Sequence, residues 1–267
     1  MTFPVYFYLG PLRLHPHFVM EALAYGLGLY FVLFRRLVRP AQSEAALTDS
    51  SSDVSSEILP SQRSSISVGA LVGALLGAKL LVMMQHVNLL GEDWRMFALL
   101  VLQGKTIVGA LLGGLIGVEV TKKKIGVRQS TGDSFVWSVM VGMMIGRVGC
   151  FLTGLSDRTY GIATTLPWGV DFGDGISRHP TQLYEVIFLA GLSFLLWLYA
   201  REKRQSGDLF KVFMIAYLGF RFGIDFIKPE FRLVLSLSAI QVACLCGLTY
   251  YRKDAMRLIR SFMAPPL

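Results

Sequence analysis

Residues 134–153 read SFVWSVMVGMMIGRVGCFLT, an apolar run that carries one charged side chain, Arg147. An α-helix rises about 1.5 Å per residue, so a run of this length crosses a hydrocarbon core of about 30 Å. Lipid offers the backbone no hydrogen-bond partners, whereas a helix satisfies its own N–H and C=O groups. The stretch therefore predicts a transmembrane helix.

Seven apolar runs of this kind predict an all-α integral membrane protein. The chain is 53% hydrophobic and 16% charged, whereas soluble domains are about 25% charged. A soluble helical protein with a large apolar core is therefore disfavoured, and we expect residues 1–267 to form a single transmembrane domain. The predicted spans are Phe18–Phe34, Ser67–Gln85, Met96–Val120, Ser134–Thr153, Thr181–Ala200, Leu209–Ile227 and Leu233–Tyr251.

The distribution of positive charge indicates how the helices are oriented. Lys and Arg are concentrated in alternate connections, and cytoplasmic loops are the ones enriched in these residues. This pattern predicts an N-terminus outside and a C-terminus in the cytoplasm. The formal net charge of +8 is accounted for by this topology, so nucleic acid is not an expected partner. The basic connections are residues 35–39, 122–128, 201–204 and 252–260.

Two connections differ from the short loops. Residues 41–65 are polar and Ser-rich with no apolar period, which predicts a mobile cytoplasmic loop, either a spacer or a regulatory segment. Residues 154–180 lie on the opposite, periplasmic side, and a loop of this length often covers or shapes a site. Residues 1–10 lack the positive region of a secretory signal peptide, so the first span is expected to stay in the protein.

The cysteines suggest neither a disulfide framework nor a metal site. Cys150, Cys244 and Cys246 all lie within predicted spans. The spacing of potential ligands along the chain gives no metal-binding cluster, and we expect no metal and no cofactor.

Glycine recurs at four-residue spacing in two of the predicted spans. Residues at this spacing share one face of a helix, and small residues there let two helices approach closely in lipid. We interpret both glycine faces as packing surfaces without a catalytic role. The two sets are Gly69, Gly73 and Gly77, and Gly109, Gly113 and Gly117.

Two arginines lie deep in predicted spans. At 1.5 Å per residue, Arg147 lies about 20 Å and Arg221 about 18 Å from the cytoplasmic ends of their helices. An ionised group at such depth costs at least about 2.5 kcal/mol, so each needs a partner. Guanidinium binds phosphate in a fork, and a phospholipid headgroup is a membrane-borne phosphate. For Arg221, which shares a helix face with Tyr217 and Asp225, the alternative is a structural ion pair with Asp225.

The run RHPTQLYE at residues 178–185 begins the fifth span. Pro180 is expected just inside the helix, where its missing N–H is harmless. His179 is a candidate for the outer mouth of the helical bundle and Glu185 for its interior. A histidine at a helix start is usually structural, so this segment alone indicates little.

Three segments together resemble the bacterial prolipoprotein diacylglyceryl transferases. Residues 146–154, GRVGCFLTG, look like the family signature around its essential arginine. The run at 178–185 matches a family segment almost letter for letter. Tyr217, Arg221 and Asp225 repeat the family's tyrosine, arginine and acid, with Asp in place of Glu.

The resemblance implies a reaction at a bacterial inner membrane. The diacylglyceryl group of phosphatidylglycerol would move to the lipobox cysteine thiol of a prolipoprotein signal peptide, releasing glycerol 1-phosphate. The site would face the periplasmic leaflet, and the arginines would stabilise charge on the leaving phosphate. The candidate catalytic residues are Arg147, Arg221, Asp225 and Lys105. The candidate phosphatidylglycerol-binding residues are Arg147, Arg221, Tyr217, Gly154, His179, Glu185, Gln182 and His17.

The chain departs from the family pattern at the thiol end of the reaction. Val108 stands where the family has a third-span histidine, which is often assigned to thiol activation. Cys150 replaces the signature asparagine, Leu155 replaces the acid that follows, and the first-span tyrosine aligns near His17. Lys105 would compensate as a base if buried, serve as a third phosphate cation, or only reach the interface. His17 is the second candidate base.

Two other functions stay open at this point. The chain could keep the phospholipid site and use a different acceptor, or it could hold a lipid headgroup without catalysis. A missing lipid product without lost lipoproteins would indicate the first, and released glycerol 1-phosphate would exclude the second. We find no inverted repeat and no paired broken helices of the kind that indicate a transporter.

Overall fold

The computed structural model describes residues 3–38, 58–201, 205–229, 231–234 and 236–263. The chain divides into two compact units. The first contains Met1–Ser55, Thr131–Phe213 and Ile227–Pro229, and the second contains Ser56–Ser130, Met214–Phe226 and Glu230–Leu267.

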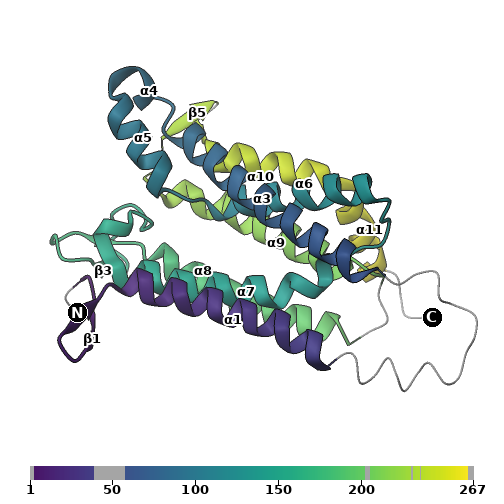
Figure 1. Cartoon of the computed structure of the whole chain (residues 1–267). Coiled ribbons are helices and arrows are strands. Elements are labelled where there is room, and N and C mark those ends of the chain that lie inside the picture. The colour runs from purple at the N-terminus through teal and green to yellow at the C-terminus, as the bar shows by residue number, and fades with distance from the viewer. Residues whose placement is uncertain (1–2, 39–57, 202–204, 230, 235, 264–267) are drawn as a thin grey trace, which may run out of the picture. The chain divides into compact units, whose positions relative to one another are not determined.

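Three long helices form the frame of the first unit. α1 (Pro16–Val38), α7 (Val136–Thr153) and α8 (Thr181–Tyr199) cover the first, fourth and fifth predicted spans. Short 3-10 turns, η2 (Gly132–Phe135) and η3 (Gly154–Asp157), precede and follow α7. Both α1 and α8 pack along α7 (Figure 1). Fully buried apolar side chains of α7 and α8 include Val136, Met140 and Leu189.

Two glycines let the N-terminal part of the chain approach the end of α7. A Cβ at Gly149 would lie 2.7 Å from the Cβ of Met20 in α1, which is too close for any other residue to fit without a shift. Gly154 ends α7 with φ 71° and ψ −136°, a conformation that glycine adopts readily and other residues avoid. A Cβ at Gly154 would also lie 2.7 Å from the side chain of Phe3. The first turn of α1 and the segment before it are thereby held against the end of α7.

The predicted 154–180 loop is ordered and has a small aromatic core. Within it β3 (Val170–Asp171) pairs antiparallel with β4 (Ser177–Arg178). A second hairpin pairs β1 (Phe7–Leu9) with β2 (Leu12–Leu14) near the N-terminus. The side chain at the centre of the loop core is Phe172, which packs against the rings of Phe3, Phe151 and Tyr160.

The second unit is built around two antiparallel helices. α3 (Pro60–Gln85) and α6 (Ile107–Ile125) lie side by side (Figure 1). α4 (Leu89–Glu92) and α5 (Trp94–Gln103) connect them. α10 (Ala239–Tyr250) packs against both α3 and α6.

The glycine faces of α3 and α6 pack against each other, which confirms the predicted packing role. A Cβ on any of the six glycines would overlap with the opposing helix, in most cases with a glycine carbonyl oxygen. The two backbones are therefore in direct contact, as small residues at this spacing allow. The opposing pairs are Gly69–Gly117, Gly73–Gly113 and Gly77–Gly109.

The third predicted span, Met96–Val120, is not one continuous helix. The helix breaks at residues 104–106, and α5 and α6 are bent by 67° across the break. Lys79 of α3 stabilises the break, because an ammonium group satisfies the carbonyl groups that have no partner at a helix C-terminus. Its Nζ lies 2.9, 2.7 and 2.8 Å from the carbonyl oxygens of Val101, Leu102 and Gly104.

α9 (Asp208–Ile224) covers the sixth predicted span and crosses from the first unit into the second. Its start is fixed by Asp133, whose carboxylate accepts hydrogen bonds from the backbone N–H groups of Gly207 and Phe210, at 2.6 and 2.9 Å. The 3-10 turn η4 (Asp225–Ile227) follows the helix.

Two further boundaries need correction. The last predicted span, Leu233–Tyr251, is helical only over α10, because β5 (Arg232–Val234) and β6 (Leu237–Ser238) form a hairpin before it, and α11 (Arg252–Met263) follows it. The Ser-rich segment 41–65 lies in part outside the described residues. Its last residues belong to α3, which begins at Pro60, and proline is tolerated in the first turn of a helix.

Three helical stretches within the described part of the chain are long and apolar enough to cross a membrane. They are Pro60–Gln85, Gly132–Asp157 and Thr181–Tyr199, and the bent α5–α6 pair is a fourth if it forms one span. On α3 the large side chains of Leu71, Leu75 and Leu76 are exposed. Apolar patches of this kind are rare on soluble monomers, and they suit contact with lipid. The complete count of seven spans stays a prediction.

Candidate active site

Arg147 and Glu185 form a buried ion pair between α7 and α8. The Nε atom of Arg147 lies 2.8 Å from Oε2 of Glu185, and the two side chains are 8% and 2% exposed. A charge buried without a partner costs several kcal/mol, so each of the two groups requires the other. The sequence predicted both as site residues but gave no sign of their contact, because they lie on different helices.

Gln182 lies one turn before Glu185 on the same face of α8. The side chain is 1% exposed, and neither Oε1 nor Nε2 has a hydrogen-bond partner among the residues that the structure describes. Buried amides are nearly always hydrogen-bonded, and leaving one unpaired costs about 1–3 kcal/mol. An amide in this state fits a group that meets a substrate, and the sequence placed Gln182 in the phosphatidylglycerol site.

A hydrogen-bonded chain fixes the residues just before α8. The indole Nε1 of Trp168 donates to the hydroxyl of Tyr184 at 2.8 Å, and that hydroxyl lies 3.1 Å from Nδ1 of His179. Thr181 Oγ1 also donates to the carbonyl of Thr159 at 2.6 Å. His179 thus has a structural partner at the helix start, and its role in phospholipid binding stays a prediction.

Arg178 closes the β3–β4 hairpin rather than joining the buried pair. Its Nη1 and Nη2 lie 2.6 and 2.7 Å from the two carboxylate oxygens of Asp174, and its guanidinium lies 5.0 Å from the ring centroid of Tyr160. The hydrogen bonds from Arg178 hold the pKa of the Asp174 carboxyl below its ordinary value. This surface pair anchors the loop that precedes α8.

In the second unit, the ion pair that the spacing of Arg221 and Asp225 allowed is present. Nη2 of Arg221 lies 3.5 Å from Oδ1 of Asp225, with side-chain exposures of 5% and 0%. The Nη1 atom of Arg221 is buried and has no hydrogen-bond partner within the described part of the chain. Tyr217, one turn before Arg221, is fully buried. The ion pair between Arg221 and Asp225 is thus confirmed. Nη1 of Arg221 stays available to an anion.

A buried polar network holds Asp225 in place. The Ser238 hydroxyl donates to Oδ2 of Asp225, and Nη2 of Arg232 lies 3.2 Å from the Asp225 backbone carbonyl. Gln241 accepts a 2.8 Å hydrogen bond from Nη1 of Arg232, and its Nε2 donates to the carbonyl of Phe222 at 3.2 Å. Ser238 and Gln241 also form a capping box at the start of α10. Neither Ser238 nor Arg232 was predicted as a site residue, because a turn separates each of them from their partner, Asp225.

The chain matches the family described as prolipoprotein diacylglyceryl transferase over residues 4–251. The chain belongs to this family. A phosphatidylglycerol–prolipoprotein diacylglyceryl transferase of Geobacter sulfurreducens is 33% identical over 238 residues, which cover 87% of this chain and 85% of that protein. No solved structure matches the chain.

Other members of the family are similar over a shorter stretch. A transferase of the same name from Solidesulfovibrio magneticus is 39% identical over 129 residues, covering 43% of this chain and 46% of that protein. One from Cupriavidus necator is 37% identical over 131 residues, covering 45% of this chain and 46% of that protein. These two matches span about half the length of each relative.

Two residues singled out at the thiol end of the predicted reaction lie at or next to the break between α5 and α6. Val108, at the position of the expected histidine, is 1% exposed and closes the first turn of α6 with an apolar side chain. Lys105 is exposed and lies in the break itself. The burial that a lysine base requires is therefore not present at Lys105.

Gly154 has a structural role that the sequence did not predict. Its positive φ and its contact with Phe3 both depend on the absence of a side chain. A substitution there would strain the backbone at the end of α7, whether or not the residue touches lipid.

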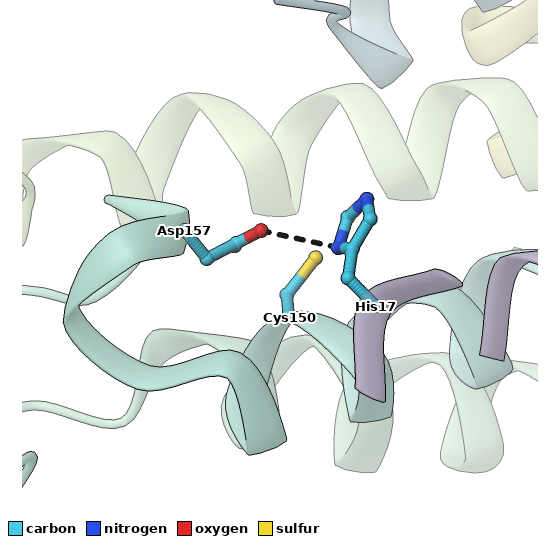
Figure 2. A group of neighbouring side chains, drawn as sticks. All are labelled: His17, Cys150 and Asp157. Carbon is cyan, nitrogen blue, oxygen red and sulfur yellow. Dashed lines mark ion pairs between the residues drawn. The ribbon is translucent and has the colours of Figure 1, made fainter. Parts of the chain in front are cut away.

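His17 is brought next to two residues that were not in the predicted site. It lies in the first turn of α1, and its Nδ1 is 3.3 Å from Oδ1 of Asp157 at the end of η3. The Sγ of Cys150 completes the group, and the three potential ligand atoms all lie within 4.8 Å of one another (Figure 2). Cys150 was noted only as a departure from the family signature, and Asp157 was missed because 140 residues separate it from His17 in the sequence.

Proposed function

We propose that this chain transfers the diacylglyceryl group of phosphatidylglycerol to the lipobox cysteine thiol of a prolipoprotein. Glycerol 1-phosphate would be the other product. The family membership and the names of the relatives support this function, since both describe a prolipoprotein diacylglyceryl transferase.

The observation that carries the proposal is the buried guanidinium of Arg147, oriented through its Nε by Glu185 at 2.8 Å. In the proposed reaction a carbon–oxygen bond breaks and negative charge develops on the departing phosphate. A cation that is already fixed and shielded from water stabilises this charge without having to reorganise. The unpartnered amide of Gln182, on the same helix face as Glu185, supports a polar substrate group at this place.

Arg221 is proposed as a further phosphate-binding cation. Its Nη2 contacts Asp225, while its buried Nη1 lacks a hydrogen-bond partner in the described residues. A guanidinium that is paired through one nitrogen atom and unpaired at another is suited to bind an anionic group by donating hydrogen bonds to it.

The acceptor half of the reaction requires a group that activates the thiol. Val108 provides no base at the position where the family resemblance implies a histidine, and Lys105 is exposed. A second candidate function therefore keeps the phospholipid chemistry and uses a different acceptor. Loss of a lipid product from a deletion strain that retains its lipoproteins would favour this second function.

We further propose that the chain crosses a bacterial inner membrane seven times, with its N-terminus outside and its C-terminus in the cytoplasm. The site would then lie toward the periplasmic leaflet. The alternation of basic connections supports this orientation, and the apolar, exposed faces of the long helices support the membrane location.

The test is a reconstituted transfer assay. Membranes that contain this protein, phosphatidylglycerol and a lipobox peptide should yield lipidated peptide and glycerol 1-phosphate, and Arg147→Ala should reduce both by at least about 100-fold, as removal of a transition-state contact does. An established transferase of the family serves as the positive control. If the control lipidates the peptide and this protein does not, the proposal is wrong for this acceptor.

A further inference from the structure

We propose that His17, Cys150 and Asp157 bind a zinc ion, and that the open coordination position of this ion takes the acceptor thiol. The second part rests on the proposed function, and the first does not. The three side chains come from the first turn of α1, from α7 and from the end of η3, and they converge on one point (Figure 2).

The distance between the His17 and Asp157 donor atoms fits a tetrahedral ion. Zinc binds nitrogen and oxygen at about 2.0–2.1 Å, so the edge of a regular tetrahedron that joins two such ligands is about 3.3–3.4 Å long. Nδ1 of His17 lies 3.3 Å from Oδ1 of Asp157. By strict geometry the buried Nδ1 makes no hydrogen bond, so its close neighbours at this point are the other two members of the group, Asp157 and Cys150. The third donor, Sγ of Cys150, lies within 4.8 Å of a potential ligand atom of each of the other two residues.

The groups behind the donors orient them as they do in metal sites. The ring nitrogen of a metal-bound histidine that does not bind the metal usually faces a carboxylate, and a metal-bound carboxylate is itself hydrogen-bonded. Nε2 of His17 lies 3.7 Å from Oε2 of Glu21, which points Nδ1 toward the other donors. The hydroxyl of Thr159 donates to Oδ2 of Asp157, which leaves Oδ1 to face His17.

The kinds of donor select zinc over the other common ions. Magnesium and calcium prefer oxygen ligands alone, and copper(I) prefers sulfur, whereas zinc takes Cys, His and Asp together. Structural zinc sites use four protein ligands, while catalytic ones use three and keep a position open. The grouping contains three ligands within the described residues. The His17 side chain is 35% exposed, although the Nδ1 atom that faces the other two donors is buried.

An open coordination position on the zinc ion would activate the acceptor thiol, which the apolar side chain of Val108 cannot do. A thiol that binds zinc loses its proton, which is released to water, and the bound sulfur is a thiolate at neutral pH. The thiolate sulfur would form a bond to the glyceryl carbon while the bond from that carbon to the phosphate oxygen breaks. The electron pair of that bond would leave on glycerol 1-phosphate. Arg147 lies one turn before Cys150 on α7, so both ends of the reaction would be held by the same helix.

Metal binding is tested on the full chain purified in detergent, by elemental analysis and by titration with cobalt, which reports thiolate ligation as a charge-transfer band. The wild type and Cys246→Ser, which removes an exposed thiol elsewhere, should each bind about one ion per chain. Cys150→Ser should lose the charge-transfer band. Cys150→Ser and Asp157→Asn should each bind zinc at least about 10-fold more weakly, since even groups behind the ligands change metal affinity by about 10–100-fold. Circular dichroism and gel filtration identify any variant that fails to fold, in which case Asp157→Asn carries the test.

The outcomes separate the site from its proposed use. A folded wild type that binds neither ion, or a Cys150→Ser protein that keeps the wild-type affinity and spectrum, overturns the zinc site. For the acceptor role, a lipobox cysteine peptide should strengthen the charge-transfer band of the cobalt form, and the matching serine peptide should not. A band unchanged by the cysteine peptide overturns that role. If both spectroscopic results are as expected and only lipid transfer fails, the result counts against the proposed function and not against the zinc site.

Discussion

Glu185 is the residue that allows a permanent cation to lie inside a helix pair. Removing its charge leaves the Arg147 guanidinium buried with its Nε contact to a carboxylate lost. Breaking a buried pair on one side is far more costly than replacing both partners by apolar groups. The two kinds of substitution therefore separate stability from function.

We expect Glu185→Gln to lower the free energy of unfolding by about 3–5 kcal/mol. The double substitution Arg147→Met with Glu185→Leu should recover most of this loss, because no charge is then left unpaired. Thermal unfolding in detergent measures the stability, and the lipid-transfer assay measures the function. Recovery of transfer in the double variant would contradict the role of Arg147.

Replacing Gln182 should have the opposite effect from replacing Glu185, because stability should be kept while substrate binding weakens. Its amide has no hydrogen-bond partner among the described residues, so Gln182→Met should leave stability unchanged or raise it by about 1 kcal/mol. If the amide contacts the lipid headgroup, the same substitution should raise the KM for phosphatidylglycerol by about 10-fold, the equivalent of one lost hydrogen bond. A variant that is less stable and fully active would show that the amide has a structural partner instead.

At the scale of elements, the contact between α3 and α6 depends on the absence of side chains. A Cβ at Gly73 would overlap with the carbonyl oxygen of Gly113. We expect Gly73→Val to force the two helices apart and to lower the unfolding temperature of the protein strongly.

The matched control is Gly191→Val, at a helix position where an added Cβ meets no other described atom within 4 Å. This variant should unfold close to the wild-type temperature. Equal effects at both positions would indicate that helix propensity, rather than the close approach of α3 and α6, determines the result.

The break between α5 and α6 is stabilised by the ammonium group of Lys79. Lys79→Met removes the donor for three carbonyl oxygens and should cost about 2–3 kcal/mol of stability, in the range for hydrogen bonds from a charged group. Protease cleavage near residue 104 should become faster, which can be measured by limited proteolysis. Lys105→Met, in the same segment, leaves the three hydrogen bonds of Lys79 in place, so it should speed cleavage near residue 104 less than Lys79→Met does. A large loss of transfer activity in Lys105→Met would restore it as a candidate base.

At the scale of the whole molecule, the orientation in the membrane can be measured directly. Thr165→Cys lies in the 154–180 loop and Lys124→Cys in the basic connection after α6, and both positions are exposed. In intact cells without their outer membrane, a membrane-impermeant maleimide should label Thr165→Cys and leave Lys124→Cys at the level of the wild type. The reverse pattern would place the basic connection outside and contradict the predicted topology.

Several features were predicted from the sequence because they depend on short stretches of chain. Hydrophobicity over about 20 residues identifies a membrane helix, and glycine at every fourth position identifies a face that packs closely. The segments around Arg147, residues 178–185 and Arg221 were sufficient to indicate the family, which the comparison over residues 4–251 confirms. The helix boundaries were less accurate at residues 104–106 and at the β5–β6 hairpin, because the groups that stabilise them, such as Lys79, come from other elements.

The sequence by itself determined that this is a helical membrane protein with buried arginines and a family likeness. Only the tertiary structure decided what those arginines contact and which side chains meet at the end of α7. Glu185 reaches Arg147 from another helix, and His17 reaches Cys150 and Asp157 because Gly149 lets α1 approach α7. Such contacts depend on how helices pack, and packing joins residues whose separation along the chain carries no signal of their distance in space.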